Sequence, residues 1–327
     1  MNNKRAIACI GQGFVGGSLS VGMCHAFDVY AYDKAGKVAD PRRRGKIING
    51  ALTYKKGVPR FDEVKPLPEF VKKIENDEKI DFTRIYFVGV PTPMRKDGSA
   101  DTRIVESVLE ELASVDGERI AVVKSTCPPG STERWNEMFN KYGLHVIFNP
   151  EFLTEANAID DFLNQTRIIL GGPRPWINDV KLTYQAAYPK VPIIKTSSTT
   201  AELVKYTINC FLATKVSFAN EMYDICTALD KLGLNVDYDK VVEYVKYDQR
   251  IGGSHWAVPG PVVVDGKHVR GFGGHCFPKD MNALAYVARQ VGVEPVVIEG
   301  AMKKNLEVRP PEHRDWELLV GRAVSDD

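Results

Sequence analysis

The sequence predicts an α/β fold in which a doubly wound parallel sheet is followed by a helical domain. Short apolar runs alternate with amphipathic stretches up to about residue 196, and a long helical pattern without Gly or Pro begins directly afterwards. The length of 327 residues favours two domains, each long enough to bury a core.

Seven apolar runs are predicted to form the strands of the sheet. Most are rich in Val and Ile, and helix-like segments lie between most of them. This pattern is typical of a parallel sheet covered by helices on both faces. The runs are Ala6–Ile10, Val29–Tyr32, Ile85–Val90, Ile120–Val123, Val146–Phe148, Ile168–Leu170 and Val191–Ile194.

The sequence pattern changes after Thr196 from alternating apolar runs and amphipathic stretches to one long helical pattern. Residues 197–200 can cap a helix whose pattern continues to Gly233, and such a helix would span roughly 50 Å at 1.5 Å per residue. We interpret it as a spine that joins two domains or two subunits. Further helices are expected at Asp239–Tyr247 and Met281–Gln290. The predicted domains are therefore residues 1–197, residues 198–305 and a short polar tail at 306–327.

Charge and cysteine content narrow the function classes. The 43 basic and 42 acidic residues leave a net charge of +1, which argues against a dedicated nucleic-acid or anionic-membrane binder. The six cysteines form no CxxC pair, and no apolar stretch reaches about 18 residues. We therefore expect a cytoplasmic protein with reduced thiols, with no nucleic-acid or membrane partner.

A glycine-rich turn follows the first predicted strand and opens a helical pattern. Glycines in a G-x-G-x-x-G stretch allow a tight turn and close approach of a pyrophosphate to a helix N-terminus. Asp33 ends the next strand, where a carboxylate can bind an adenosine ribose and repel a 2′-phosphate. The sequence thus predicts a Rossmann-type domain that binds NAD rather than NADP. The predicted cofactor residues here are Gly11, Gly13, Phe14, Val15, Gly16 and Asp33.

Three further turns follow predicted strands, at the sheet edge where ligands of α/β proteins bind. Thr92 in VPTP and Thr126 in STCPPG are expected to face the nicotinamide half of the cofactor, although each alone is typical of an ordinary turn. In NPEFLTE, Glu151 and Glu155 are four residues apart and would share a face if locally helical. They could hold a water, accept a proton or bind sugar hydroxyls, and a solvated acidic loop is an equal alternative.

The segment around Cys276 carries the sharpest chemical signal. Glycines precede it, and Lys279 and Asp280 follow, so local positive charge could stabilise a thiolate. A thiolate is useful for oxidising an aldehyde, because the adduct can lose hydride and become a thioester. A buried structural thiol is the plainer alternative for Cys276, and nothing in the sequence has metal-ligand spacing. On the long helix, Lys205 and Asn209 share a face, for which exposed helix surface is the alternative.

Seven motifs in order, from residue 11 to residue 280, resemble the UDP-glucose/GDP-mannose dehydrogenase family. They are GQGFVG, VPTP, STCPPG, NPEFLTEA, AELVKYTIN, RIGG and GFGGHCFPKD. The resemblance implies an NAD-dependent, four-electron oxidation of the C6 alcohol of a nucleotide sugar to a uronic acid. It also implies a homodimer built through the long helix near residues 199–232.

The resemblance also implies roles for individual residues. Cys276 would capture the C6 aldehyde, Lys205 and Asn209 would stabilise the oxyanion, and Asp280 would support general-base catalysis with Lys205. Thr126 and Glu155 match positions at the nicotinamide end and near an ordered catalytic water, and Lys279 matches a position near the cofactor. The positions matching substrate contacts are Glu151, Phe152, Leu153, Arg250 and Gly273, together with Lys205 and Asn209.

One departure from the family pattern concerns the nucleotide. Family members carry a further α/β domain after the cysteine motif, and residues 281–327 are too few to form it. We therefore expect a short form, in which residues 255–270 either contact the nucleotide or form a loop without that role. The predicted activity is oxidation of UDP-glucose to UDP-glucuronate. The alternatives are a GDP-mannose or other nucleotide-sugar dehydrogenase, a two-electron oxidation, and an NAD- or nucleotide-sugar-binding regulatory protein.

Overall fold

The computed structural model describes residues 5–34, 37–39, 47–49, 51–55, 58–62, 66–154 and 157–326, with the backbone alone described between 37 and 62. The chain forms two compact units. Unit 1 comprises Met1–Thr92 and Thr102–Lys205, and unit 2 comprises Pro93–Asp101 and Tyr206–Asp327. The division at Lys205 lies inside the long helix, eight residues after the predicted end of the first domain at residue 197.

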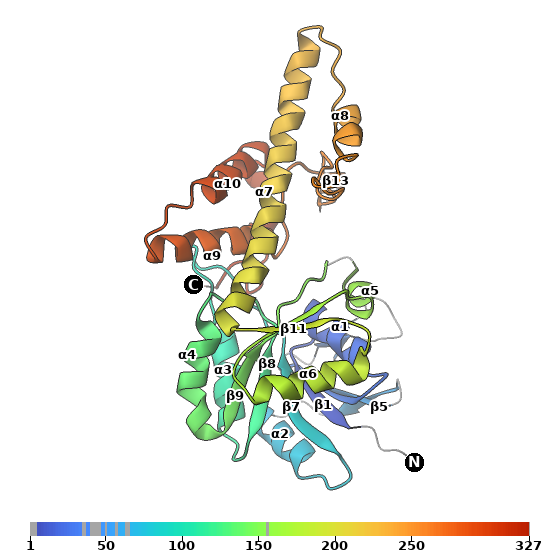
Figure 1. Ribbon diagram of the computed structural model, residues 1–327, viewed down its shortest axis with the longest axis vertical. Helices are drawn as coiled ribbons and strands as arrows, with labels where there is room; N and C mark the ends of the chain where they lie inside the picture. The colour runs from blue at the N-terminus through green and yellow to red at the C-terminus, as the bar shows by residue number, and fades with distance from the viewer. Residues whose placement is uncertain are drawn as a thin grey trace. The chain divides into compact units, whose positions relative to one another are not determined.

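Unit 1 is built on a nine-stranded sheet in the order β11-β10-β9-β8-β7-β1-β2-β5-β6 (Figure 1). Its five central strands, from β9 to β2, pair in parallel, and all seven predicted runs fall on strands. The predicted α/β fold is therefore confirmed. The strands are β1 (Ala6–Ile10), β2 (Asp28–Tyr32), β5 (Ala51–Lys55), β6 (Val58–Asp62), β7 (Phe82–Val88), β8 (Arg119–Val123), β9 (Leu144–Phe148), β10 (Ile168–Gly171) and β11 (Ile193–Thr196).

Several strand predictions need correction. β5 and β6 extend the sheet as an antiparallel hairpin, and β3 (Lys37–Ala39) pairs with β4 (Ile47–Asn49) in a separate sheet. None of these four was predicted, because antiparallel edge strands do not need a continuous apolar run. β7 ends at Val88 and β11 begins at Ile193, so the outer residues of those two predicted runs lie in turns beside Pro91 and Pro192.

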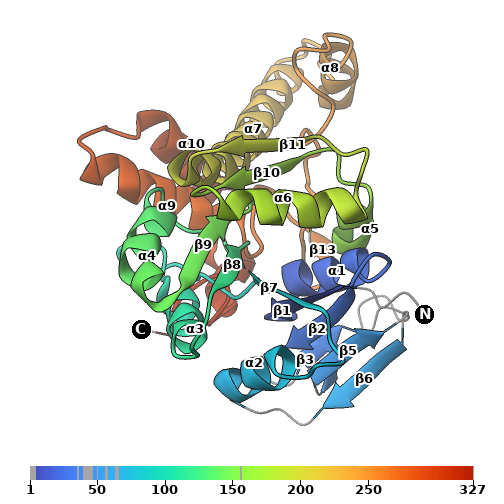
Figure 2. The same ribbon diagram turned by 60° about the horizontal axis from the view of Figure 1, so that its bottom comes forward.

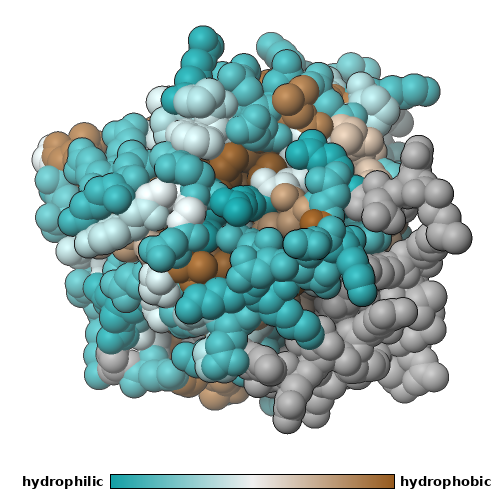
Figure 3. Space-filling view, turned by 90° about the horizontal axis from the view of Figure 1, so that it is seen from below, coloured by the Kyte–Doolittle hydropathy of each residue, from teal (hydrophilic) through white to brown (hydrophobic). Residues whose placement is uncertain are grey.

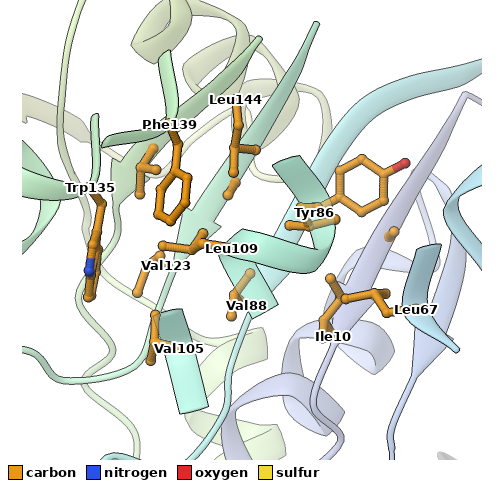
Figure 4. Packing of buried hydrophobic residues seen from close by; sticks show 14 of the residues in the cluster. Ile10, Leu67, Tyr86, Val88, Val105, Leu109, Val123, Trp135, Phe139 and Leu144 are labelled. Atoms are coloured by element: carbon orange, nitrogen blue, oxygen red, sulfur yellow. The ribbon is translucent and has the colours of Figure 1, made fainter. Parts of the chain in front are cut away.

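Helices cover both faces of the sheet, and two separate hydrophobic clusters lie beneath them. Side chains of α2 (Leu67–Glu75), α3 (Arg103–Ala113) and α4 (Ser131–Phe139) pack against one face (Figure 4). Those of α1 (Phe14–Met23), α5 (Ala158–Leu163) and α6 (Trp176–Ala187) pack against the other (Figure 2). Neighbouring residues of β1 alternate between the clusters, as the two-residue period of a strand requires.

The strand order places a switch point at β1. The chain passes from β1 to β2 on one side of it and later returns to β7 on its other side. In open α/β sheets, ligands bind in the crevice beyond the carboxyl ends of strands at such a point. The turn after β1, which begins at Gly11, lies at this position.

Unit 2 is organised around α7 (Ser198–Lys231), which confirms the predicted long helix. Ser197 Oγ accepts from Thr200 N at 3.2 Å at its start, and Gly233, with φ +80°, follows its end. α9 (Phe277–Gln290) and α10 (Val296–Val308) pack on α7 through one cluster, and α8 (Tyr238–Val245) through another (Figure 1). α9 begins four residues earlier than predicted, because Pro278 is accepted in a first helical turn, and α10 was not predicted.

The remaining segments of unit 2 are short. β12 (Val263–Val264) and β13 (Lys267–His268) form a small hairpin, and short 3₁₀ turns follow α10 at Pro311–His313 and Asp315–Leu318. Trp316 and Ala323 are buried in this unit.

Residues 93–101 belong to unit 2 although the predicted first domain surrounds them in sequence. Met94 N donates to Ala323 O at 2.8 Å, and Ser325 N donates to Met94 O at 2.7 Å. The Ser325 hydroxyl also donates to Asp101 Oδ2 at 3.0 Å. This loop, which follows Thr92, is thus held by residues more than 220 positions later.

Among the residues drawn in colour in Figure 3, hydrophilic residues predominate and the hydrophobic patches are small. Among the residues that the structure describes, no helix combines the length and apolar character needed to cross a membrane.

We expect Arg119→Met to destabilise the protein by about 3–5 kcal/mol, because it would leave a buried carboxylate without its cation. The Arg119 side chain is fully buried, pairs with Glu75 at the end of α2 at 3.1 Å, and donates to the carbonyls of Leu112, Val115 and Asp116. Urea denaturation measures the change. The control is Arg134→Met, which breaks a more exposed pair with Glu106 and should cost about 1 kcal/mol or less. Equal effects of the two substitutions would contradict the expectation.

Candidate active site

The turn after β1 is shaped by its first and third glycines. A Cβ on Gly11, which has φ +83°, would lie 2.5 Å from the carbonyl oxygen of Gly89, and one on Gly16 would lie 1.8 Å from that of Gly11. A Cβ on Gly13 would meet nothing within 4 Å, so open space lies beside the residue that immediately precedes α1. Phe14, the first residue of α1, is 47% exposed. A dinucleotide pyrophosphate fits this space at the helix N-terminus.

Asp33 lies next to this turn at the end of β2. Its Oδ2 accepts a hydrogen bond from the backbone N–H of Gln12 at 2.9 Å, which fixes the carboxylate beside the glycines. The buried side-chain amide of Gln12 donates to the backbone carbonyls of Cys9 and Gly11. The acid and the open turn together fit the ribose and pyrophosphate of NAD.

The turns after β7 and β8 are tied together at the same sheet edge. The Ser125 hydroxyl accepts from Val90 N at 3.0 Å and donates to Val90 O at 2.7 Å. Thr92 is buried in the first turn, and Thr126 is partly buried in the second. The structure therefore brings the segments that carry both threonines into contact.

The turn after β9 carries a buried ion pair. Glu151 is 9% exposed, and its carboxylate lies 2.9 Å from Lys124 Nζ, which also donates to Asn149 Oδ1 at 2.8 Å. Residues 151–154 are not helical, so the condition for two carboxylates on one helical face is not met over these residues. Glu155 lies outside the described residues. Glu151 is a paired anion that orders the turn.

Lys205, in the second turn of α7, reaches this turn from the helix. It is 8% exposed, donates to the carbonyl oxygen of Glu151, and has its Nζ 5.9 Å from the centre of the Phe152 ring. The exposed-surface alternative for Lys205 is therefore wrong. Glu151, Phe152 and Leu153 line one pocket of about 220 Å³ together with Asp161 and residues 164–168.

In unit 2, Cys276 is the N-cap residue of α9 and is exposed. The positive end of the helix favours a thiolate at this position. Burial raises the pKa of the Cys9 thiol to about 11 and that of Cys210 to about 12. Cys276 is therefore the accessible thiol in contrast to these two, which disfavours the structural reading of this residue.

Asp280, one turn into α9, organises the side chains near Cys276. The carboxylate is 1% exposed, accepts from Asn209 Nδ2 at 2.6 Å and pairs with Lys279 Nζ at 2.5 Å. Asn209, on α7, is itself 7% exposed, so it is not a surface residue either. The structure thus brings Asn209, Lys279 and Asp280 together, and the buried negative charge of Asp280 is compensated by Lys279.

Arg250 and Gly273 differ in exposure: the first has an exposed side chain, and the second is closely packed. The Arg250 side chain is 89% exposed and pairs with Asp248 at 2.5 Å, and hydrogen bonding to Asp248 raises its pKa. A Cβ on Gly273 would lie 2.3 Å from Asp315 Oδ1. This close packing is enough to require glycine at the position, whether or not a substrate binds there.

Two buried residues that the sequence analysis did not single out contribute to these turns. Lys124 directly follows the apolar run Ile120–Val123 of β8, and this charged residue at the end of the run was its signal. Glu202 is fully buried on α7 and accepts from Gly130 N at 2.6 Å and Thr132 N at 2.8 Å. Desolvation raises the pKa of Glu202, and these hydrogen bonds oppose that effect.

A parallel sheet with a glycine-rich turn and an acid at the switch point defines a Rossmann-type dinucleotide-binding protein. Residues 5–185 match the NAD binding domain of the UDP-glucose/GDP-mannose dehydrogenase family, and residues 199–307 match its central domain. The chain belongs to this family, and its first unit carries the family's NAD-binding domain.

Individual relatives agree with this assignment. The chain is 32% identical to the UDP-glucose 6-dehydrogenase TuaD of Bacillus subtilis over 93% of its own length and 64% of that protein. It is 31% identical to the UDP-glucose 6-dehydrogenase AglM of Haloferax volcanii, over 91% of its own length and 69% of that protein. Among solved structures, a UDP-glucose dehydrogenase of Pyrobaculum islandicum matches with a TM-score of 0.69 and 28% identity. The match covers 93% of this chain and 68% of that protein. The chain thus spans slightly less than two thirds of the length of the Bacillus protein.

We expect Asp33→Ala to raise the dissociation constant for NAD about tenfold, or about 1.4 kcal/mol, because a charge-assisted hydrogen bond is lost. Asp33→Asn is the matched variant, since it keeps an acceptor but removes the negative charge. It should retain more NAD affinity and bind NADP better than the parent does. Calorimetric titration with each dinucleotide checks both expectations, and an unchanged NAD/NADP ratio in Asp33→Asn would contradict them.

We expect the free energy of unfolding to depend on His255 below neutral pH. Burial of the ring, and secondarily Lys215, lowers its pKa in the folded protein below 6.5. The stability that neutral His255 contributes is therefore present above pH 6.5 and lost as the pH falls through the lower, folded-state pKa. His255→Asn suits the backbone, which has φ +66°, and should weaken this pH dependence in urea denaturation at pH 7.5 and 5.5. If the free energy of unfolding falls equally from pH 7.5 to 5.5 in the parent and in His255→Asn, the expectation is refuted.

Proposed function

We propose that the protein is an NAD-dependent nucleotide-sugar 6-dehydrogenase that oxidises UDP-glucose to UDP-glucuronate. The observation that carries the proposal is the accessible Cys276 at a helix N-terminus, four residues before a buried Asp280 bonded to Asn209, in a chain with an NAD-binding domain. Similarity to proteins named UDP-glucose 6-dehydrogenase supports the choice of substrate.

In the proposed mechanism, two NAD molecules, bound one after the other, would each supply the hydride acceptor for one of two oxidations. Between them, the Cys276 sulfur adds to the C6 aldehyde and forms a thiohemiacetal. Loss of hydride from this carbon leaves a thioester, which water hydrolyses to the carboxylate and the free thiolate. The sulfur thereby prevents release of the aldehyde.

Polar residues of the family motifs are proposed to stabilise the negative charge that develops on the C6 oxygen. Donors of the Lys205 and Asn209 type stabilise an oxyanion, and Asp280 orients the Asn209 amide through their hydrogen bond. Together with Lys205, Asp280 assists removal of a proton from the attacking water. Thr126 and Glu155 are proposed at the nicotinamide end, and Glu151, Phe152 and Leu153 at the sugar.

The test is to incubate the protein with NAD and a panel of UDP- and GDP-sugars and to follow NADH and product mass. We expect two NADH for each UDP-glucose oxidised and no released aldehyde. A ratio of one would indicate a two-electron oxidation, preference for a GDP-sugar would overturn the substrate assignment, and binding without turnover would indicate a regulatory protein.

Cys276→Ser tests the nucleophile directly. An alkoxide is a poorer leaving group than a thiolate, so the variant should bind NAD and substrate but stall before hydrolysis, with kcat reduced by about 10³ or more. Cys24→Ser, at a partly buried thiol on the other unit, is the control and should turn over normally. Normal turnover in Cys276→Ser would remove the sulfur from the reaction.

We also propose a homodimer formed through α7. Phe211, Phe218 and Ile225 are 67%, 53% and 44% exposed and recur every seven residues, which places them along one face of the helix. A two-fold partner would bury this stripe.

Light scattering at micromolar concentration should give twice the chain mass of 36.4 kDa. Phe218→Glu should shift the protein to monomer, because a charge would be buried in the interface. Val297→Glu, at a residue of α10 that is 72% exposed, is the control and should leave the dimer intact. A monomeric parent protein would refute this assembly.

A further inference from the structure

The loop that leads to Cys276 is held along its length by side chains from α10 and the segment after it. Asn305, 2% exposed on α10, accepts from Phe272 N at 2.7 Å and donates to Phe272 O at 3.1 Å. Arg309 Nη1 donates to Gly271 O at 3.4 Å, and Asp315 Oδ2 accepts from Gly274 N at 3.0 Å. Three of the four residues from 271 to 274 are thus fixed through their backbones.

Arg309 and Asp315 also hold each other. The Arg309 guanidinium is fully buried, pairs with Asp315 Oδ1 at 2.8 Å, donates to His313 O at 2.7 Å, and lies 5.4 Å from the centre of the Trp316 ring. Each carboxylate oxygen of Asp315 therefore has a different partner, one on Arg309 and one on the loop. We call Asn305, Arg309 and Asp315 the loop clamp.

The glycines of the loop are matched to the loop clamp. A Cβ on Gly271 would lie 2.4 Å from Asn305 Oδ1, and one on Gly273 would lie 2.3 Å from Asp315 Oδ1 and 2.7 Å from Arg309 Cζ. The backbone can approach the clamp this closely only because these residues lack side chains. This direct contact transmits the position of the clamp to the residues just before Cys276.

The energetics favour positioning over stability as the role of this pair. The Arg309 guanidinium is fully buried and the Asp315 side chain is 25% exposed, so the pairing repays the desolvation of Arg309 only partly, but it specifies geometry because the buried charge requires its partner. Arg309 and Asp315 also lie beyond residue 307, where the match to the family's central domain ends.

We propose that Asn305, Arg309 and Asp315 are positioning residues that fix the loop before Cys276 and so aim its thiol at the C6 aldehyde. The proposal rests on the proposed function of Cys276 as nucleophile. Reaction requires the sulfur within a few tenths of an ångström of its productive position, and a free Gly274 N–H would let the loop shift. In this proposal the clamp acts through its hydrogen bonds to the loop backbone.

The first measurement is the rate at which iodoacetamide alkylates Cys276, located by peptide mass, with no NAD or sugar present. Asp315→Ala should change this rate constant by about threefold or more, because the loop would no longer hold the sulfur in one setting. Glu299→Gln is the control: it breaks an exposed pair with Arg289 between α9 and α10, and it should leave the rate unchanged.

The second measurement is a single turnover with excess enzyme and NAD on UDP-glucose. The first hydride transfer does not use the sulfur, whereas the second follows its addition to the aldehyde. Asp315→Ala should therefore slow the second NADH about tenfold or more while changing the first by less than about threefold. General structural damage would slow both steps equally, and that result would overturn the proposal.

Asp315→Asn keeps the test decisive if Asp315→Ala does not fold. Its one carboxamide oxygen can replace only one of the two carboxylate oxygens, so either the bond from Gly274 N–H or the bond from Arg309 is lost, and the same selective loss is expected at smaller size. A folded variant with unchanged alkylation and an unchanged second NADH would refute the clamp. Failure of the proposed function is distinct from this: it would appear as normal turnover in Cys276→Ser, whereas the alkylation rate tests the clamp without any substrate.

Discussion

The arrangement of the polar residues in unit 1 depends on one buried carboxylate, that of Glu202. It lies in the first turns of α7 and accepts the backbone N–H groups of Gly130 and Thr132, at the start of α4. These donors would otherwise lack helical partners, so Glu202 caps α4 from another element. The same bonds hold α7 against the turn that carries Thr126. Lys205, three residues further along the helix, reaches the Glu151 carbonyl because this first contact sets the position of α7.

Buried charges recur as matched pairs in both units. Lys124 with Glu151 and Lys279 with Asp280 each place an ammonium against a carboxylate in surroundings largely closed to water. An unpaired charge at either place would carry a large desolvation cost, so neither partner is replaceable alone. Pairing also removes net charge from the two turns.

Much of the fold was predictable, because strands such as β1 and β8 are continuous apolar runs and α7 has clear capping and termination signals. The hairpin of β5 and β6 has no such run, and α10 begins with a Val-Val pair that does not distinguish a helix from a strand. At the candidate site, the motifs identified Lys205, Asn209, Cys276 and Asp280, and the structure brings Asn209 against Asp280. Pairings such as Lys124 with Glu151, or Asp315 with Gly274, join residues far apart in sequence and carry no local pattern. Such contacts become visible only once the chain is folded.

The loop at residues 93–101 has a consequence for how the protein is made. Its partners, residues 323–325, follow it by more than 220 positions, and Ser325 lies 224 positions after Asp101. At about 5–20 residues per second, a ribosome needs roughly 10–45 seconds to synthesise that interval. The strands from β8 to β11 are synthesised within this interval, whereas residues 323–325 follow only at its end. All strands of the unit 1 sheet are therefore synthesised before the residues that hold the loop at 93–101, and this loop can reach its final contacts only after residues 323–325 have been translated.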